Sequence, residues 1–219
     1  MADAPPIAFL YLRKMRKKAV ALSLASHLKI AARARTAFLR HGFEAMTMVT
    51  LAKECDLTRR ALYYYFSSKE EAFRAMIRLE NSEALEAGYR AAQKALEKPR
   101  ATALDAVAEW IDARYGNTRR NLSTSPFAKD INDAAFRVCA DVLTEFAKRT
   151  HEELARLLRD LQDQKLLRLE KTMTAPAVAR LLADGARGVN QTRPPVSNKA
   201  LPQRYREISN AILYGCARR

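Results

Sequence analysis

Apolar residues recur every three or four positions along most of the chain, and this spacing is typical of amphipathic α-helices. The first clear stretch has its apolar positions at Ile30, Ala31, Ala34, Phe38 and Leu39. It predicts a helix from about Ser26, or slightly earlier, to His41. Gly42 then suits the left-handed position that follows many helices, and Phe43 can fold back onto the last turn.

Two short helices are predicted next. Thr47 is a suitable N-cap for the first of them, and Thr58 for the second, whose Leu62 and Phe66 share one side. The apolar positions of the first are Met48, Leu51, Ala52 and Cys55. Between the two helices, Asp56 occupies a turn position that needs a positive φ and usually holds glycine, at a cost of about 1 kcal/mol. This is the pattern of a helix-turn-helix.

Helical periodicity continues through the rest of the chain. Ser68 and Glu71 form a capping box that opens a fourth helix reaching about residue 97. Residues 117–125 are predicted to be a polar loop, and Ser125-Pro126 to start the next helix. Further helices are expected at about 102–115, 126–167 with a candidate break near 132–133, 175–186 and 203–217. Because the sequence contains no strand pattern or internal repeat, we predict an all-α chain of about nine helices.

The formal net charge of +15 over 219 residues favours a polyanionic partner. A merely solubilising surface, a membrane surface or RNA would fit the same charge. Hydrophobic residues make up 48% of the chain and charged residues 29%, which is the composition of a folded protein. No apolar run approaches the roughly 18–20 residues that span a bilayer. A cytoplasmic protein is therefore expected.

The cysteines and histidines are scattered along the chain, without the spacing of metal ligands. They are Cys55, Cys139, Cys216, His27, His41 and His151. We therefore expect no disulfide framework, no metal site and no cofactor, as suits a reducing compartment. The sequence also lacks a nucleophile elbow and a glycine-rich phosphate loop, so an enzyme is not expected.

The segment from Ala34 to Ile77 resembles the DNA-binding domain of the TetR family of bacterial transcriptional regulators. The shared features are, in order, Phe38…His41-Gly42-Phe43, Thr47, Leu51-Ala52, Leu62-Tyr63-Tyr64-Tyr65-Phe66 and Ser68-Lys69-Glu70. The resemblance covers about one fifth of the chain, and Asp56 departs from it by replacing the usual glycine. It implies an N-terminal three-helix DNA-binding domain and a C-terminal helical bundle for ligand binding and dimerisation. The function implied is a DNA-binding regulator, above all a ligand-responsive homodimeric repressor that binds a palindromic operator.

A helix that begins near Thr58 places Arg59 and Arg60 where a recognition helix meets base edges. Each arginine can donate to guanine O6 and N7 or to a phosphate, and the sequence leaves both alternatives open. By resemblance, Tyr64 would pack on bases or thymine methyl groups. The phosphate contacts that the resemblance implies are those of Thr47, Tyr63, Tyr65 and Lys69. Phosphate contacts would set the register, and base contacts would specify the sequence.

Three parts of the chain are expected: a flexible basic arm over 1–25, a helix-turn-helix domain over 26–70, and a ligand-binding and dimerisation domain over 71–219. The cations of the arm are Arg13, Lys14, Arg16, Lys17 and Lys18. They would raise the non-specific affinity for DNA or follow the adjacent minor groove.

In the TetR family a regulatory pocket usually lies within the helical bundle, and the last two helices usually form the dimer interface. Candidates for the pocket are Tyr89, Trp110, Tyr115, Phe127, Phe136, Phe146 and Met173. Candidates for the dimer seam are Leu181, Leu182, Ile208, Ile212, Leu213 and Tyr214. Ordinary core packing is the alternative for both sets. The effector is an unidentified small molecule, and control by a protein partner instead is the alternative function.

Overall fold

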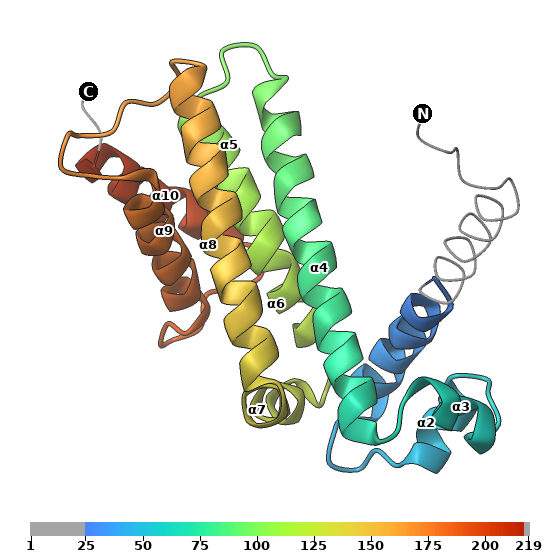
Figure 1. Ribbon diagram of the computed structural model, residues 1–219. Helices are drawn as coiled ribbons and strands as arrows, with labels where there is room; N and C mark the ends of the chain where they lie inside the picture. Colours follow the sequence, from blue (N-terminus) through green and yellow to red (C-terminus); the bar gives the residue numbers. More distant parts are fainter. Residues whose placement is uncertain (1–24, 217–219) are drawn as a thin grey trace, which may run out of the picture. The chain divides into compact units, whose positions relative to one another are not determined.

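The computed structural model describes residues 25–216, and this part of the chain is built from helices and short connections (Figure 1). Its elements are a helix over 25–41, α2 (Met48–Glu54), α3 (Arg59–Tyr65), α4 (Lys69–Leu96), α5 (Ala103–Ile111), the π-helical turn η1 (Asp112–Gly116), α6 (Asn117–Ser123), α7 (Ala128–Val138), α8 (Ala140–Asp163), α9 (Ala175–Asn190) and α10 (Leu201–Cys216). No strand is assigned within 25–216, so the all-α prediction is confirmed. The predicted basic arm lies, apart from residue 25, outside the described residues.

The chain divides into two compact units after Leu79, within α4. α4 therefore contributes its first turns to the first unit and the remainder to the second, whereas the sequence analysis assigned all but its first turn to the second. None of the helices within 25–216 is long and apolar enough to cross a membrane. Each unit has its own buried core.

An aromatic cluster holds the first unit together. The rings of Phe38 and Phe73 lie edge to face with centroids 5.0 Å apart, and Phe43 lies 4.8 Å from Phe73. Gly42 ends the first helix with a φ of 77°, as predicted, and its amide donates to the carbonyl of Phe38 at 2.8 Å. Glycine adopts this left-handed conformation without a steric cost. The reversal of the chain at Gly42 returns Phe43 to the core.

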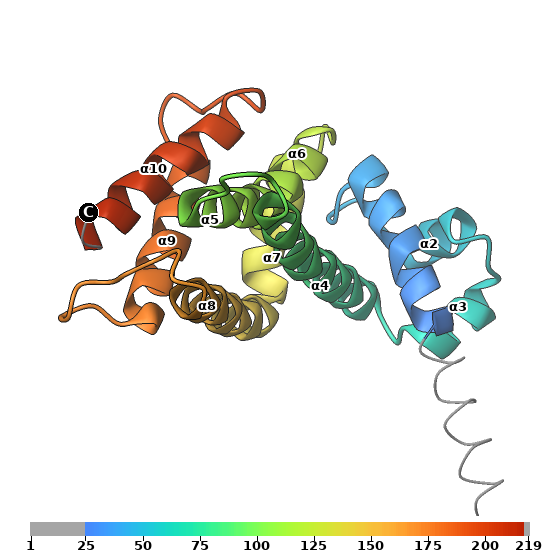
Figure 2. The ribbon, with the colours of Figure 1, turned by 90° about the horizontal axis from the view of Figure 1, so that it is seen from above.

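The second unit is a helical bundle in which α5, η1 and α6 follow one another without interruption. α9 packs against α8 and α10, and α10 also packs against α5 (Figure 2). Trp110 on α5 is 1% exposed and lies against Gly88 of α4, where a Cβ atom would lie 3.1 Å from the indole. The absence of a side chain at Gly88 therefore makes room for the largest residue of this core.

The prediction of a polar loop over 117–125 is wrong, because residues 117–123 form α6. The backbone passes directly from η1 into this helix. The guanidinium of Arg120 reaches back to the carboxylate of Asp112, with Nη1 and Oδ1 2.8 Å apart. A short helix rich in polar side chains has the composition of a loop, and only the partner across the turn stabilises it as a helix.

The boundaries of the following helices also differ from the prediction. α7 begins at Ala128, because Ser125 uses its hydroxyl to accept the amide of Phe127 in a local turn, 3.0 Å away. The break between α7 and α8 falls at the buried Cys139 and not near 132–133, and α8 ends at Asp163 rather than near 167. Apolar spacing continues through Cys139, so the pattern alone does not reveal the break.

The contact between Gly88 and Trp110 gives a prediction for stability. Gly88→Leu should lower the free energy of unfolding by about 1–3 kcal/mol, because the new side chain displaces the indole from a packed core. The matched variant is Gly188→Leu on α9, where a Cβ atom meets nothing within 4 Å. It should leave stability unchanged or raise it by up to about 1 kcal/mol through helix propensity. Urea unfolding followed by the fluorescence of Trp110, the single tryptophan of the chain, measures both effects. Equal losses in the two variants would contradict this account of Gly88.

Candidate DNA-binding interface

The turn between α2 and α3 has the geometry expected of a helix-turn-helix. Asp56 has a φ of 55°, and the amide of Leu57 donates to the carbonyl of Ala52 at 2.9 Å. Arg33 of the first helix donates through Nη1 to the carbonyl of Cys55 at 2.6 Å. Burial raises the pKa of the Cys55 thiol to about 11, so this sulfur is a core group and not a reactive one. The turn is thus tied to the first helix as well as to its own two helices.

Threonine hydroxyls start both helices, as predicted. The Thr47 hydroxyl accepts the amide of Thr50 at the start of α2, and the Thr58 hydroxyl accepts the amide of Ala61 at the start of α3. Both acceptor distances are 3.1 Å. These bonds satisfy amides that have no partner within the helix, and each cap is worth about 1 kcal/mol.

α3 has one buried side and one exposed side. Leu62 is fully buried and Phe66, just after the helix, is 3% exposed. Tyr64 is 77% exposed and Tyr63 43%. Thr58, Arg59 and Arg60 are also exposed. Two arginines and two phenol rings therefore point outward from the first two turns of the helix. The two buried apolar residues behind them fix the orientation of the helix.

Arg59 and Tyr63 form a pair one turn apart on the exposed side of α3. Arginine Nη2 lies 3.5 Å from the tyrosine hydroxyl, and Cζ lies 5.6 Å from the centre of the ring. This contact restricts the arginine side chain and places a donor group beside the phenol oxygen. Arg60 is exposed on the neighbouring side of the helix.

Tyr65 and Lys69 contact the protein itself. The Tyr65 ring lies edge to face with His27 of the first helix, with centroids 4.9 Å apart. The ammonium of Lys69 donates to the carbonyl oxygens of Phe43 and Glu44 at 3.1 and 3.3 Å, and it lies 4.6 Å from the centre of the Phe43 ring. Sequence reasoning missed this second role of Lys69, which holds the loop after Gly42 against the start of α4.

A polar contact between the first helix and α2 was also missed. Glu54 accepts hydrogen bonds from His41 at 3.0 Å and from Arg40 at 2.7 Å. The hydrogen bond from His41, followed by the charge of Arg40, lowers the pKa of the Glu54 carboxyl. The sequence signal was weak, because the partners lie at least 13 positions apart.

Residues 30–76 match the model of a family described as bacterial regulatory proteins of the tetR family. This match covers 47 of the 219 residues, from the first helix into α4, and so concerns the helix-turn-helix region. A curated relative is the uncharacterized HTH-type transcriptional regulator YfiR of Bacillus subtilis (strain 168), which is 48% identical over 44 residues. That match spans 20% of this chain and 22% of the length of the relative.

Solved structures resemble this chain over most of its length. A transcriptional regulator from Cytophaga hutchinsonii ATCC 33406 aligns with a TM-score of 0.63 at 20% identity, covering 86% of this chain and 97% of the other. SmeT, the repressor of the Stenotrophomonas maltophilia multidrug efflux pump SmeDEF, aligns with a TM-score of 0.60 at 16% identity, covering 88% and 90%. At such low identity the likeness establishes the fold alone.

The predicted pocket residues are not all in one place. Tyr115 and Phe136 line the same pocket in the second unit. Trp110 and Phe146 are buried in the core, whereas Tyr89 and Phe127 are exposed. Met173 lies partly exposed just before α9. Of the seven, Tyr115 and Phe136 are those that line the described pockets.

The predicted dimer residues divide between a core and a surface. Leu182 and Leu213 are buried within the second unit. Leu181 and Tyr214 are 44% and 45% exposed. The remaining two, Ile208 and Ile212, are partly exposed and close to Gly185 of α9, where a Cβ atom would meet them at 3.0 and 3.2 Å. α9 and α10 thus pack closely and still leave apolar side chains on their outer face.

The positive φ of Asp56 predicts a stabilising substitution in the turn between α2 and α3. Asp56→Gly should raise the free energy of unfolding of the first unit by up to about 1 kcal/mol, because glycine adopts this conformation without strain. Asp56→Val should lower it, because a β-branched residue is disfavoured at positive φ. Hydrogen exchange of the α2 and α3 amides in the full chain measures both. A stability order with Val above Gly would contradict the assigned turn geometry.

Proposed function

We propose that this chain is a homodimeric transcriptional repressor that binds a palindromic operator through α3 and responds to a small ligand in its second unit. The exposed side of α3 is the observation that carries the proposal. Arg59, Arg60, Tyr63 and Tyr64 lie there in two turns, with Leu62 buried behind them. A major groove admits one α-helix, and arginine and tyrosine supply the donors that bases and phosphates accept.

Different parts of this face suit different parts of the DNA. Arg60 is free to extend toward base edges, whereas Arg59 is already placed beside Tyr63. The hydroxyls of Tyr63 and Thr47 can donate hydrogen bonds to phosphate oxygens. The largely exposed ring of Tyr64 can pack on bases. Lys69 uses its ammonium on two carbonyls but retains a third N–H for a phosphate. The net charge of +15 adds a general attraction to DNA.

Dimerisation through α9 and α10 is part of the proposal. Two recognition helices must be held one helical turn of DNA apart to read a palindrome. Leu181 and Tyr214 are large, exposed and apolar, and Ile208 and Ile212 are partly exposed on the same pair of helices. Large apolar side chains that are left exposed are typical of surfaces that become buried against a second copy.

Ligand control is supported by the pocket that Tyr115 and Phe136 share. One neighbour of the same fold, SmeT, has been solved as a complex with triclosan. Control by a protein partner is the alternative, and it would leave this pocket without a regulatory role. Titrating small molecules against the complex of protein and operator distinguishes the two, because linkage requires ligand and DNA to weaken each other's binding by the same factor.

Operator fragments selected from random DNA provide the test of the interface. Arg60→Ala should relax the base preference at one symmetric pair of positions and cost about 1–3 kcal/mol there, if the arginine reads guanine. Arg59→Ala should show the same at another pair of positions or weaken all sites alike. Arg90→Ala removes an equal charge from an exposed position on α4 and should leave the sequence preference intact. Unchanged binding in both α3 variants would remove this helix from the interface.

The dimer seam gives a separate prediction. Leu181→Asp should convert the dimer to a monomer, because it would bury two unpaired carboxylates at a two-fold interface. Binding to the full palindrome should fall by at least about tenfold, and binding to a single half-site should change little. Analytical ultracentrifugation and gel-shift titration measure the two effects. A variant that stays dimeric would place the interface elsewhere.

A further inference from the structure

A buried positive charge stands at the centre of the second unit. Arg114, in the π-helical turn η1, is 6% exposed. Its Nη2 donates to the amide oxygen of Asn81 at 2.9 Å, and its Nε lies 3.3 Å from the hydroxyl oxygen of Thr150. Both acceptors are neutral. Removing a guanidinium from water is costly unless an anion compensates it, so this arginine has a reason to bind one.

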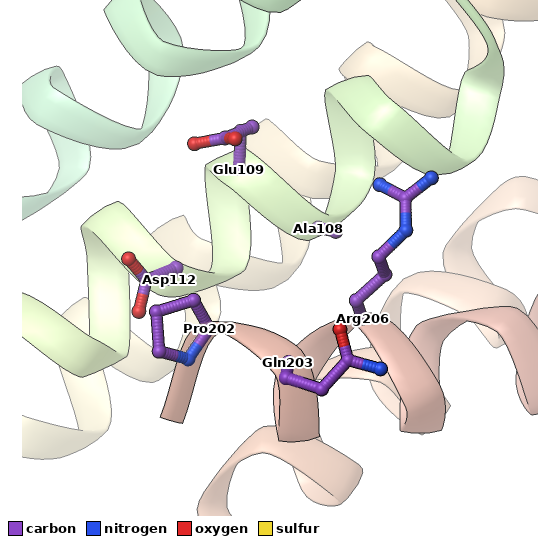
Figure 3. Close-up of a pocket in the computed structure, with 6 residues that line it drawn as sticks. All are labelled: Ala108, Glu109, Asp112, Pro202, Gln203 and Arg206. Atoms are coloured by element: carbon purple, nitrogen blue, oxygen red, sulfur yellow. The ribbon is translucent and has the colours of Figure 1, made fainter. Parts of the chain in front are cut away.

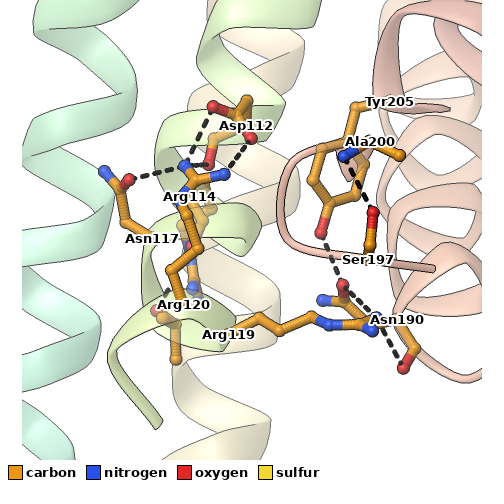
Figure 4. A network of polar contacts seen from close by, with 10 residues as sticks. Asp112, Arg114, Asn117, Arg119, Arg120, Asn190, Ser197, Ala200 and Tyr205 are labelled. Atoms are coloured by element: carbon orange, nitrogen blue, oxygen red, sulfur yellow. Dashed lines mark hydrogen bonds and ion pairs between the residues drawn. The ribbon is translucent and has the colours of Figure 1, made fainter. Parts of the chain in front are cut away.

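The neighbouring arginines are already satisfied (Figure 4). Arg120 holds the carboxylate of Asp112 through both Nη atoms, at 2.8 and 2.9 Å. Arg119 donates to the backbone carbonyls of Asn190 and Val196 at 3.1 and 2.7 Å, and so fixes the end of α9. These contacts are structural. Arg114 differs from both in being more buried, and it differs from Arg120 in having neutral hydrogen-bond acceptors instead of a carboxylate.

The surroundings of Arg114 offset its charge only in part, through the Tyr115 ring, whose centre lies 5.1 Å from the guanidinium carbon. Burial lowers the pKa of Arg114; Tyr115 and Glu80 oppose that change, whereas the charge of Arg187 adds to it. Arginine keeps its proton at neutral pH even when its pKa is lowered. Arg187 pairs with Asp184 on its own helix. The Arg114 side chain is therefore left with a positive charge in a setting of low dielectric constant, where an anion is attracted strongly.

The charge of Arg114 lies in a π-helical turn that continues the buried helix α5. Arg114, Tyr115 and Gly116 are all buried in this turn. A Cβ atom at Gly116 would lie 2.3 Å from Oδ1 of Asp112, so a larger residue there would displace that carboxylate. Such single π-turns are frequent at functional sites.

Arg114 and Tyr115 line a pocket of ≈ 550 Å³, which is a usual size for a small-molecule site. Its apolar walls come from α7 and α8, through Phe136, Ala140, Leu143 and Ala147. Its polar residues are Asn81, Arg114, Thr118, Thr144, Thr150 and Arg187. A neighbouring pocket shares Arg114, Tyr115 and Phe136 with it and adds Arg119, Lys129 and Arg193 to the cations. The lining thus combines several positive charges with an apolar wall.

A third, smaller pocket between α5 and α10 does not have this character (Figure 3). Its volume is ≈ 140 Å³, and Glu109 and Asp112 contribute carboxylates to its lining. Its cation, Arg206, already pairs with Asp105 at 2.8 Å. The pocket of ≈ 550 Å³, where Arg114 has no carboxylate as hydrogen-bond partner, is therefore better suited to an anion.

We propose that Arg114 binds the anionic group of an amphipathic organic anion, a carboxylate or phosphate monoester on an apolar body. The anionic group lies on the guanidinium of Arg114, with Arg187 and the Tyr115 hydroxyl beside it. The apolar body lies along Phe136, Leu143 and Ala147. This inference names the ligand class of the pocket, and it rests on the proposed function only in taking that pocket to be the regulatory one.

Calorimetry on the full chain without DNA tests the site directly. The probes are decanoate, decyl phosphate, 1-decanol and inorganic phosphate, each below the concentration at which it forms micelles. Decanoate or decyl phosphate should bind at least about tenfold more tightly than 1-decanol, because a charge-assisted hydrogen bond is worth a factor of about 10–100. Whichever of the two binds more tightly identifies the anionic group. Equal binding of decanol and both anions, or no binding of either anion, would overturn the proposal.

Arg114→Met keeps the bulk of the side chain and removes its charge. It should weaken binding of the preferred anion by about 10- to 100-fold and leave 1-decanol unaffected, a pattern that a general loss of packing would not produce. Arg156→Met, at an exposed position on α8 outside this pocket, is the matched control and should bind as the natural chain does. Unchanged anion binding in a folded Arg114→Met variant would refute the role of this residue.

Two further variants keep the test decisive if Arg114→Met does not fold. Ala147→Phe fills the apolar wall and should weaken decanoate and 1-decanol alike. Arg187→Met should weaken the anions alone. If neither variant changes anion binding, the site is not this pocket.

The anion site and the proposed function can be supported or refuted independently of each other. Anion binding that depends on Arg114 but does not alter operator affinity would support the site and refute the ligand-responsive repressor. Operator binding without any anion binding would refute the anion site and support the DNA-binding part of the proposed function.

Discussion

A helix as short as α3, with seven residues, is not stable by itself in water. Its position depends on Leu62 and Phe66, whose burial in the core of the first unit determines which residues face outward. Because successive residues of a helix point about 100° apart, burying these two necessarily exposes Arg60, Tyr63 and Tyr64. The proposed contact with DNA is therefore a consequence of packing behind the helix, and a change in that packing would turn the arginines away.

The same packing explains why contacts remote from α3 matter to it. The cluster of Phe38, Phe43 and Phe73 forms the core that the helix-turn-helix packs against. Lys69 then holds the loop carrying Phe43, and Arg33 holds the carbonyl of Cys55. Each of these cations satisfies backbone oxygens that have no helical partner, a requirement of any buried or partly buried chain reversal. Some of the positively charged side chains of this strongly basic chain therefore stabilise the first unit itself, in addition to those that are proposed to contact DNA.

The second unit distributes its arginines in the same way, with one difference. Arg120 donates to the carboxylate of Asp112 in η1, and Arg119 donates to the carbonyl of Val196 after α9. Both side chains therefore form their hydrogen bonds within the protein. Arg114 is buried beside them without a carboxylate as hydrogen-bond partner. Burying such a charge destabilises the unit, and the π-helical turn that contains it is irregular as well. A binding site gives a reason for the buried charge and the irregular turn to occur at the same place, which packing alone does not.

Local chemistry was enough to predict the N-terminal elements. The caps at Thr47 and Thr58, the glycine at Gly42 and the positive φ of Asp56 act over a few residues, so their signals are complete within the sequence. The polar segment that forms α6 was missed because its stabilising partner, Asp112, lies behind a π-helical turn that periodicity does not reveal. The break at Cys139 was missed because apolar spacing runs through it.

The sequence by itself determined the all-α class, the helix-turn-helix and the set of outward residues on α3, because these follow from periodicity, caps and short-range sterics. Only the tertiary structure decided which bulky residues share a pocket, which leucines of α9 and α10 are core, and which arginines are compensated. Those properties depend on side chains tens of residues apart in the chain. Seven aromatic and methionine residues were equal candidates for the pocket, and two of them line it. The residue that gives the pocket its chemical character, Arg114, carried no signal, because its burial arises from the packing of helices around it.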